Sequence, residues 1–215
     1  MRLLAALSVL SALVLGSAPD ALALTKKSSQ LYRGHVPAVQ NSFQQATSLV
    51  AKAVAANLPA ARPTGTKAPS SLLSALEVDI VGRINAQRGA RGLRALRVSR
   101  GLTAAANYHS RQMGIFGFFE HESRNGAPFW RRIERFYPSR GYSSWTVGEN
   151  LLWGSNSYGA AFAVREWMES PPHRENMLSR SWREVGIGAV HFVSAPGEYR
   201  GRTVTILTAD FGARR

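Results

Sequence analysis

Histidine is the side chain best suited to metal binding and proton transfer near neutral pH, and the chain has five. His121 follows two phenylalanines and precedes Gly126 in a segment that reads as a loop, where functional side chains often collect. His173 follows a Ser-Pro-Pro turn, where one expected helix ends and another begins. Because a helix N-terminus disfavours positive charge, we expect His173 to be neutral, the form that binds metal or accepts a proton.

A glutamate provides a partner for these histidines. Glu149 lies in the apolar stretch TVGENLLWG, within the triplet Gly148–Asn150 that we interpret as a loop. A buried carboxylate needs a partner, and histidine can supply one. Two histidines and a glutamate from separate loops could hold zinc or a similar ion with an open position. They could equally form a neutral, hydrogen-bonded cluster that joins the loops, and the metalloprotease motif H-E-x-x-H is absent.

The other three histidines are weaker candidates. His109 falls on the apolar stripe of an expected helix, which favours a packed and hydrogen-bonded core histidine over a ligand. His191 is interpreted as a surface residue at the end of a strand, and His35 as part of an N-terminal tail.

These side chains require helices and strands to position them. Helical periodicity and capping signals predict four helices: one opened by the capping box Ser74–Glu77 and closed by Gly89–Gly92, then Ser99–Gly114, Tyr158–Glu169 and a short His173–Leu178. The intervening middle region is expected to be irregular. Two β-rich runs, 185–190 and 203–211, flank a turn-rich segment and predict an antiparallel hairpin. Helices followed by a hairpin indicate an α+β domain.

The N-terminal part has the features of an export signal. Residues 1–23 combine Arg2, an apolar run and the small-residue pattern Ala21-Leu22-Ala23, which predict a cleaved signal peptide. The run is shorter than the ~20 residues of a membrane span, so the mature form is expected to be soluble, without a transmembrane span, and either secreted or periplasmic. Residues 24–75 would form an N-terminal segment with an amphipathic helix (41–58) and a Pro/Ala/Thr-rich linker (59–69), followed by a domain over 76–213.

Composition limits the chemistry and suggests partners. The chain has no cysteine, which excludes disulfides, zinc fingers and a thiol nucleophile. Its net charge is +14, and every basic residue after Lys67 is arginine. Such a field would attract anionic cell-envelope components, although an arginine bias from genome composition explains the same pattern. No basic block with interleaved aromatic residues indicates specific nucleic-acid binding.

Several short segments occur in a recognisable order. They are 85–88 (NAQR), 106–110 (ANYHS), 119–121 (FEH), 148–150 (GEN), 167–176 (WMESPPHREN), 184–188 (EVGIG) and 211–212 (FG). Together they resemble the CAP superfamily domain (cysteine-rich secretory, antigen 5 and pathogenesis-related proteins), in its short bacterial SCP-like form. The resemblance covers residues 76–212 and implies an α-β-α sandwich with a central antiparallel sheet.

The resemblance also implies a cleft lined by two histidines and two acids. Three of these positions are occupied by His121, Glu149 and His173. Ser170 stands where many members carry the second glutamate. Glu166 and Glu169 are weak substitutes for that acid, and Glu166 ranks higher because it stacks on Ser170 at helical i, i+4 spacing.

Two functions follow as hypotheses. The preferred one is a secreted, non-enzymatic binding module, with a lipid, a sterol or a divalent metal as ligand. Six aromatic residues could line an apolar groove, although ordinary core packing is the favoured interpretation: Phe116, Phe118, Phe119, Phe129, Trp130 and Trp153. The alternative is a zinc-dependent hydrolase or peptidase, with zinc on His121 and His173 and Glu149 as general base. Asp210-Phe211-Gly212 spells the kinase metal triplet but is interpreted as a strand end.

Overall fold

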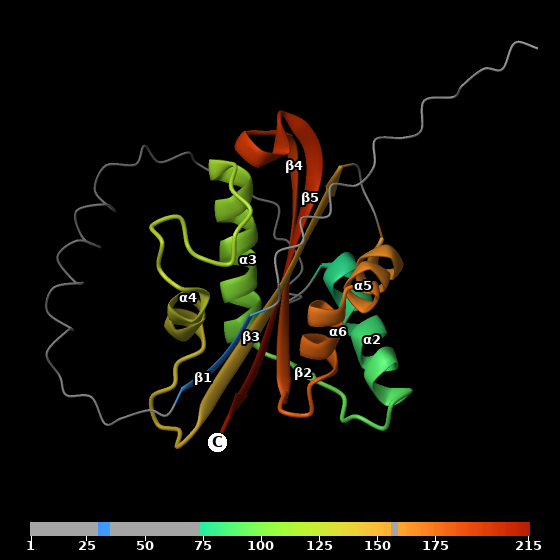
Figure 1. Ribbon diagram of the computed structural model, residues 1–215, viewed down its shortest axis with the longest axis vertical. Helices are drawn as coiled ribbons and strands as arrows, with labels where there is room; N and C mark the ends of the chain where they lie inside the picture. The colour runs from blue at the N-terminus through green and yellow to red at the C-terminus, as the bar shows by residue number, and fades with distance from the viewer. Residues whose placement is uncertain (1–29, 35–73, 156–158) are drawn as a thin grey trace, which may run out of the picture.

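The computed structural model describes residues 30–34, 74–155 and 159–215 (Figure 1). Four features inferred from the sequence lie outside these residues: the signal peptide (1–23), His35, the helix over 41–58 and the linker (59–69). The domain boundaries drawn from them stay predictions.

Along the described residues, helices alternate with strands, and the strands form a single sheet. The helices are α2 (Ala75–Gly89), α3 (Arg100–Phe116), α4 (Phe129–Phe136), α5 (Ala160–Glu169), α6 (Pro171–Leu178) and the short 3₁₀ helix η1 (Gly197–Tyr199). The strands are β1 (Gln30–Gly34), β2 (Arg97–Val98), β3 (Trp145–Ser155), β4 (Glu184–Ala195) and β5 (Arg202–Arg214). In the described part of the chain, no helix is long and apolar enough to cross a membrane.

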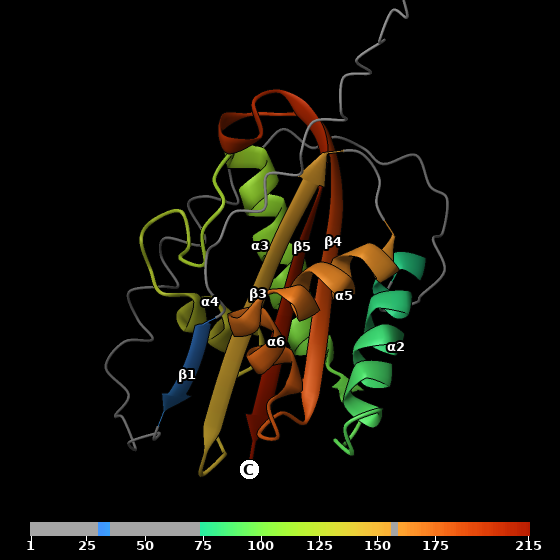
Figure 2. The ribbon, with the colours of Figure 1, turned by 45° about the vertical axis from the view of Figure 1, so that its right-hand side comes forward.

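The sheet has the order β1-β3-β5-β4-β2 and lies between two layers of helices. All neighbouring strands run antiparallel except β2, which pairs parallel with β4. Figure 1 shows α3 and α4 on one face of the sheet and α2, α5 and α6 on the other. Figure 2 shows β1 at the outer edge, beside β3. The expected α+β class and α-β-α sandwich are confirmed.

Capping residues define where the helices begin. The Ser74 hydroxyl accepts from the Glu77 amide and the Glu77 carboxylate accepts from the Ser74 amide, so the capping box is confirmed. The Ser99 hydroxyl caps α3 by accepting from the Leu102 amide, without a reciprocal side-chain bond. The last helix, α6, begins at Pro171 and not at His173 as predicted. Proline fits the first turn because that turn's amide hydrogens have no intrahelical acceptor.

The middle of the chain is regular, which corrects the expectation of an irregular region. Residues 129–136 form α4, and the Gly148–Asn150 triplet lies inside β3 and not in a loop. Because β3 is covered on both faces, its residues are buried almost throughout and its sequence lacks the alternation that marks a half-exposed strand. His191 lies inside β4, where its Nδ1 is 3.2 Å from the Thr205 hydroxyl, and so does not end a strand.

Two glycines allow α3 to lie close against the sheet. A Cβ atom on Gly186 would be 2.1 Å from the backbone of Leu102, and one on Gly188 would be 2.4 Å from that of Ala106. The Ser110 hydroxyl donates to the Gly188 carbonyl at 3.1 Å and adds a polar contact at the same place. The two glycines of the Gly186-Ile187-Gly188 segment therefore fix the position of α3, the helix that carries His109.

The aromatic residues considered for a ligand groove are mostly part of the core. Phe119, Phe129 and Trp153 are buried, and Phe118 and Trp130 pack against the same clusters. Phe116 is 43% exposed at the end of α3. The favoured interpretation of these side chains as core is confirmed for the three buried rings.

Candidate functional site

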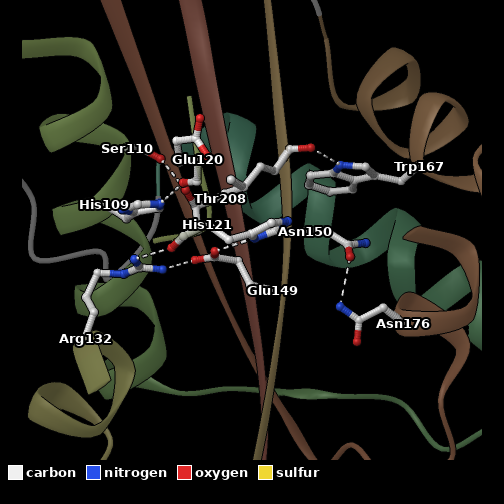
Figure 3. Close-up of polar contacts among 11 residues, drawn as sticks. His109, Ser110, Glu120, His121, Arg132, Glu149, Asn150, Trp167, Asn176 and Thr208 are labelled. Carbon is white, nitrogen blue, oxygen red and sulfur yellow. Dashed lines mark hydrogen bonds and ion pairs between the residues drawn. The ribbon is translucent and has the colours of Figure 1, made fainter. Parts of the chain in front are cut away.

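Strand β3 directs two neighbouring polar side chains to opposite faces of the sheet. Successive residues of a strand alternate in direction, so Glu149 faces α3 and α4 whereas Asn150 faces α6. Both residues are fully buried. The Asn150 amide donates to the His173 carbonyl at 3.0 Å, and Asn176 donates to the Asn150 oxygen at 2.9 Å. Asn150 therefore holds in place the helix that carries His173 (Figure 3).

Glu149 is held by two partners, one on each carboxylate oxygen. Its Oε1 is 2.7 Å from Nδ1 of His121. Its Oε2 accepts from Nη2 of Arg132, whose Nη1 also donates to the His121 carbonyl at 3.0 Å. All three side chains are buried (Figure 3). The structure therefore brings His121 and Glu149 into direct contact and adds an arginine from α4.

The charge of Arg132 decides the ionisation of Glu149. Burial by itself would raise the pKa of this carboxyl, but the charge of Arg132 and the hydrogen bond from His121 outweigh burial and hold the pKa well below its usual range. Glu149 is therefore a carboxylate. A carboxylate only accepts hydrogen bonds, so Nδ1 of His121 carries the proton in this contact.

A second buried acid faces Glu149 from the next strand. Asp210 of β5 is directly opposite Glu149 in the β3–β5 ladder and is fully buried. Burial, followed by the negative charge of Glu149, raises the pKa of Asp210 well above its ordinary value. Two carboxyl groups this close do not both ionise, so Asp210 keeps its proton.

His109 lies beside this cluster as a core residue, in agreement with the sequence interpretation. It is 1% exposed, and its Nε2 is 2.8 Å from the Glu120 carbonyl (Figure 3). Burial, with the positive charge of Arg132, lowers the pKa of His109 to about 3. His109 is therefore neutral, and Nε2 donates its hydrogen to the carbonyl.

His173 is neutral as expected, but chiefly for a different reason. Burial lowers the pKa of His173 to about 4, with a further contribution from the charge of His121. Nδ1 of His173 is 2.7 Å from the hydroxyl of Ser170, the residue that replaces the second glutamate.

The two imidazoles share one unusual property. Each Nδ1 has a hydrogen-bond partner, whereas each Nε2 is buried and has no partner within the described part of the chain. Buried polar atoms in native proteins are nearly always satisfied. Nε of Arg132 and the carboxyl oxygens of Asp210 also lack a hydrogen-bond partner among the described residues, but of these partnerless atoms only the two Nε2 atoms are imidazole nitrogens, the usual metal-binding atoms of histidine.

The two substitute acids each contact Arg165. The Glu166 carboxylate is 3.4 Å from Arg165 Nη2, and that of Glu169 is 3.8 Å from Arg165 Nε on an exposed part of α5. Among the described residues, no group of three or more histidine, aspartate and glutamate side chains is arranged to hold a metal ion.

Sequence reasoning missed two members of the buried cluster. Arg132 lies in a helix that was not predicted and is one of many arginines, so nothing in the sequence distinguishes it. Asp210 had a usable signal, because it is a lone acid inside the apolar run TILTADF, as Glu149 is inside its own run. A buried carboxylate needs a partner whether it is Glu149 or Asp210.

A family model decides the relationship. Residues 81–201, more than half of the chain, match the model of the cysteine-rich secretory protein family, CAP. The chain belongs to the CAP family. It does so without the cysteines in that family's name, so disulfides do not hold this CAP domain together.

Relatives of this CAP domain occur in bacteria. An uncharacterized protein of Bacillus subtilis, YkwD, is 35% identical over 128 residues, which are 59% of this chain and 47% of that protein. The chain thus spans about half the length of this curated relative. An extracellular SCP-domain protein of Bacillus anthracis has the same fold, with a TM-score of 0.50 and 21% identity over 69% of this chain and 44% of that one. An outer surface protein of Borrelia burgdorferi has a TM-score of 0.47, with 17% identity over 64% of this chain and 92% of that one.

Proposed function

We propose that the protein is an exported, non-enzymatic CAP-domain binding module that takes a divalent transition-metal ion, such as zinc, between His121 and His173. The observation that carries the proposal is the pair of buried Nε2 atoms without hydrogen-bond partners in the described residues. Neutral imidazole is the commonest metal ligand in proteins.

The hydrogen bonds at Nδ1 support this role. The Glu149 carboxylate accepts a hydrogen bond from Nδ1 of His121, so in the neutral imidazole the lone pair lies on Nε2. Metal-binding histidines commonly have a carboxylate or a similar group at the second ring nitrogen, where it fixes the tautomer and the ring direction. Ser170 occupies the corresponding place beside His173. Both rings are thus oriented before a ligand arrives.

The available donors favour exchangeable binding over a structural metal centre. Both oxygens of Glu149 already contact His121 and Arg132, so the protein would supply two imidazoles and leave the other positions to water or a bound molecule. Structural zinc centres usually have four protein ligands. An ion held by two imidazoles instead keeps coordination positions open, so a bound molecule can contact both the ion and the protein.

The geometry gives the hydrolase hypothesis little support. In that hypothesis Glu149 is the general base, yet Arg132 holds the pKa of this carboxyl far below neutrality. A general base works best with a pKa near the working pH. A lipid or sterol groove has equally little support, because most of the aromatic residues considered for it are in the core.

Export is part of the proposal and rests on the N-terminal sequence and on membership of a secretory family. We propose residues 1–23 as the signal peptide, 24–75 as an N-terminal segment and 76–213 as the CAP domain. N-terminal sequencing of the exported protein would test the first boundary.

The metal site is tested by calorimetric titration of the purified chain with zinc. We expect saturable binding of one ion, and His173→Ala should lower the affinity more than about tenfold, because losing even an outer-shell partner of a ligand costs that much. The matched control is His191→Ala, which removes a histidine from β4 and should leave zinc binding unchanged. Absence of binding to the wild type, or equal effects of the two variants, would disprove the proposal.

A further inference from the structure

A pocket separate from the histidine pair opens on the α3–α4 side of the sheet. Its volume is about 550 Å³, within the range of small-molecule sites. Six residues of its lining matter here: Tyr108 and Gln112 of α3, Phe118 and Arg124 of the following loop, and Arg131 and Arg135 of α4. His121, Glu149 and His173 do not line it.

Arginines dominate the charge of the pocket lining. Arg132 also lines it, but the charge of that guanidinium is paired with Glu149. Three further guanidinium groups remain, those of Arg124, Arg131 and Arg135. No carboxylate occurs among the lining residues in the described part of the chain. Positive charges around a concave, partly apolar surface raise the local concentration of anions.

Aromatic rings hold these three guanidinium groups. The distances from each guanidinium carbon to the ring centroid beneath it are 4.0 Å for Arg124 over Phe116, 5.4 Å for Arg131 over Trp130 and 5.6 Å for Arg135 over Tyr108. Such contacts fix the head group through a ring face and leave its N–H donors, which lie in the guanidinium plane, free for another partner. Less side-chain entropy is then lost when an anion binds.

We propose that this pocket binds a phosphate-bearing ligand. The planar guanidinium group of arginine can donate two parallel hydrogen bonds to phosphate oxygens. Three guanidinium charges also match the charge of a phosphate group better than that of a single carboxylate. The rings of Tyr108 and Phe118 in the lining offer apolar surface to the organic part of the ligand. The phosphate could belong to a free organic phosphate or to a lipid headgroup. This inference does not depend on the metal-binding proposal.

Two probes distinguish the sources. Glycerol phosphate is titrated into the purified chain by calorimetry, and co-sedimentation measures attachment to phosphatidylcholine vesicles with and without phosphatidylglycerol. Binding of glycerol phosphate would indicate a free organic phosphate. Binding only to the vesicles that contain phosphatidylglycerol would indicate a lipid headgroup.

A double variant tests the pocket itself. Arg124→Gln with Arg135→Gln should weaken binding to the active probe at least about tenfold, because hydrogen bonds to charged groups are the strong ones. The control, Arg94→Gln with Arg180→Gln, removes the same charge from exposed arginines outside the pocket and should change binding little. Thermal unfolding of both variants checks that they are folded. No binding of either probe, or equal losses in the two double variants, would overturn the proposal.

Discussion

Glu149 and Asp210 are the same kind of side chain on adjacent positions of two strands, yet they carry opposite protonation states. Arg132 and His121 hold Glu149 as a carboxylate, whereas Asp210 lacks a comparable cation and must face that negative charge. The arrangement places one negative charge where it orients His121.

Replacing Asp210 by asparagine should stabilise the protein at neutral and higher pH. A group whose folded-state pKa is raised contributes stability that is present below its unfolded pKa and is lost as the pH rises through its folded pKa. The wild type loses this stability as the pH rises, whereas Asp210→Asn does not, because asparagine does not ionise. The free energy of unfolding of the two proteins should therefore be similar near about pH 4 and diverge by about 1.4 kcal/mol for each unit by which folding raises the pKa of Asp210. Urea unfolding across this pH range measures the difference.

Two further variants serve as comparisons for Asp210→Asn. Glu149→Gln makes the same chemical change but leaves Arg132 buried without its anion, so it should destabilise by roughly 3 to 5 kcal/mol. Asp79→Asn changes an exposed acid on α2 and should have a small effect. A stability difference between Asp210→Asn and the wild type that stays constant with pH would contradict the assignment of a protonated Asp210.

At the scale of elements, the contact between α3 and the sheet positions His109 and the loop that carries His121. Gly188→Ala should destabilise the protein by about 1 to 3 kcal/mol, because the added methyl group would overlap the backbone of α3 and overpack the core. Gly82→Ala on α2 is the control, since its Cβ meets nothing within 4 Å. It should stabilise the helix by roughly 0.5 to 1 kcal/mol. Thermal unfolding of both variants tests the contact, and equal effects would disprove it.

Elements with local signals could be predicted, and those defined by tertiary packing could not. The capping box, the Ser99 cap and the β4–β5 hairpin were visible in short stretches of sequence. Strand β3 has no alternation because both of its faces are covered, so the chain around Glu149 looked like a loop. Helix α4 is only 8 residues long and rich in arginine, and its apolar face is apparent only once it lies on the sheet.

At the scale of the whole molecule, the proposed site draws its residues from segments far apart in the sequence. Glu149 comes from the sheet, His121 from the loop before α4 and His173 from the helix layer on the other face. Residue types and local pattern pointed to these three residues, a family resemblance pointed to the same three, and the family is confirmed by the match over residues 81–201. Their spacing alone left a metal site and a neutral cluster equally open, because a pattern of residue types does not reveal which ring atoms are already hydrogen bonded.

We infer that Nε2 of His121 and Nε2 of His173 together receive a metal ion. The most direct measurement is the imidazole nitrogen NMR spectrum of isotope-labelled protein, recorded with and without zinc. We expect the Nε2 resonances of these two residues to shift on zinc addition, while those of His109, whose Nε2 faces the Glu120 carbonyl, stay in place. Unchanged Nε2 resonances for His121 and His173, or equal shifts for every histidine, would contradict the account.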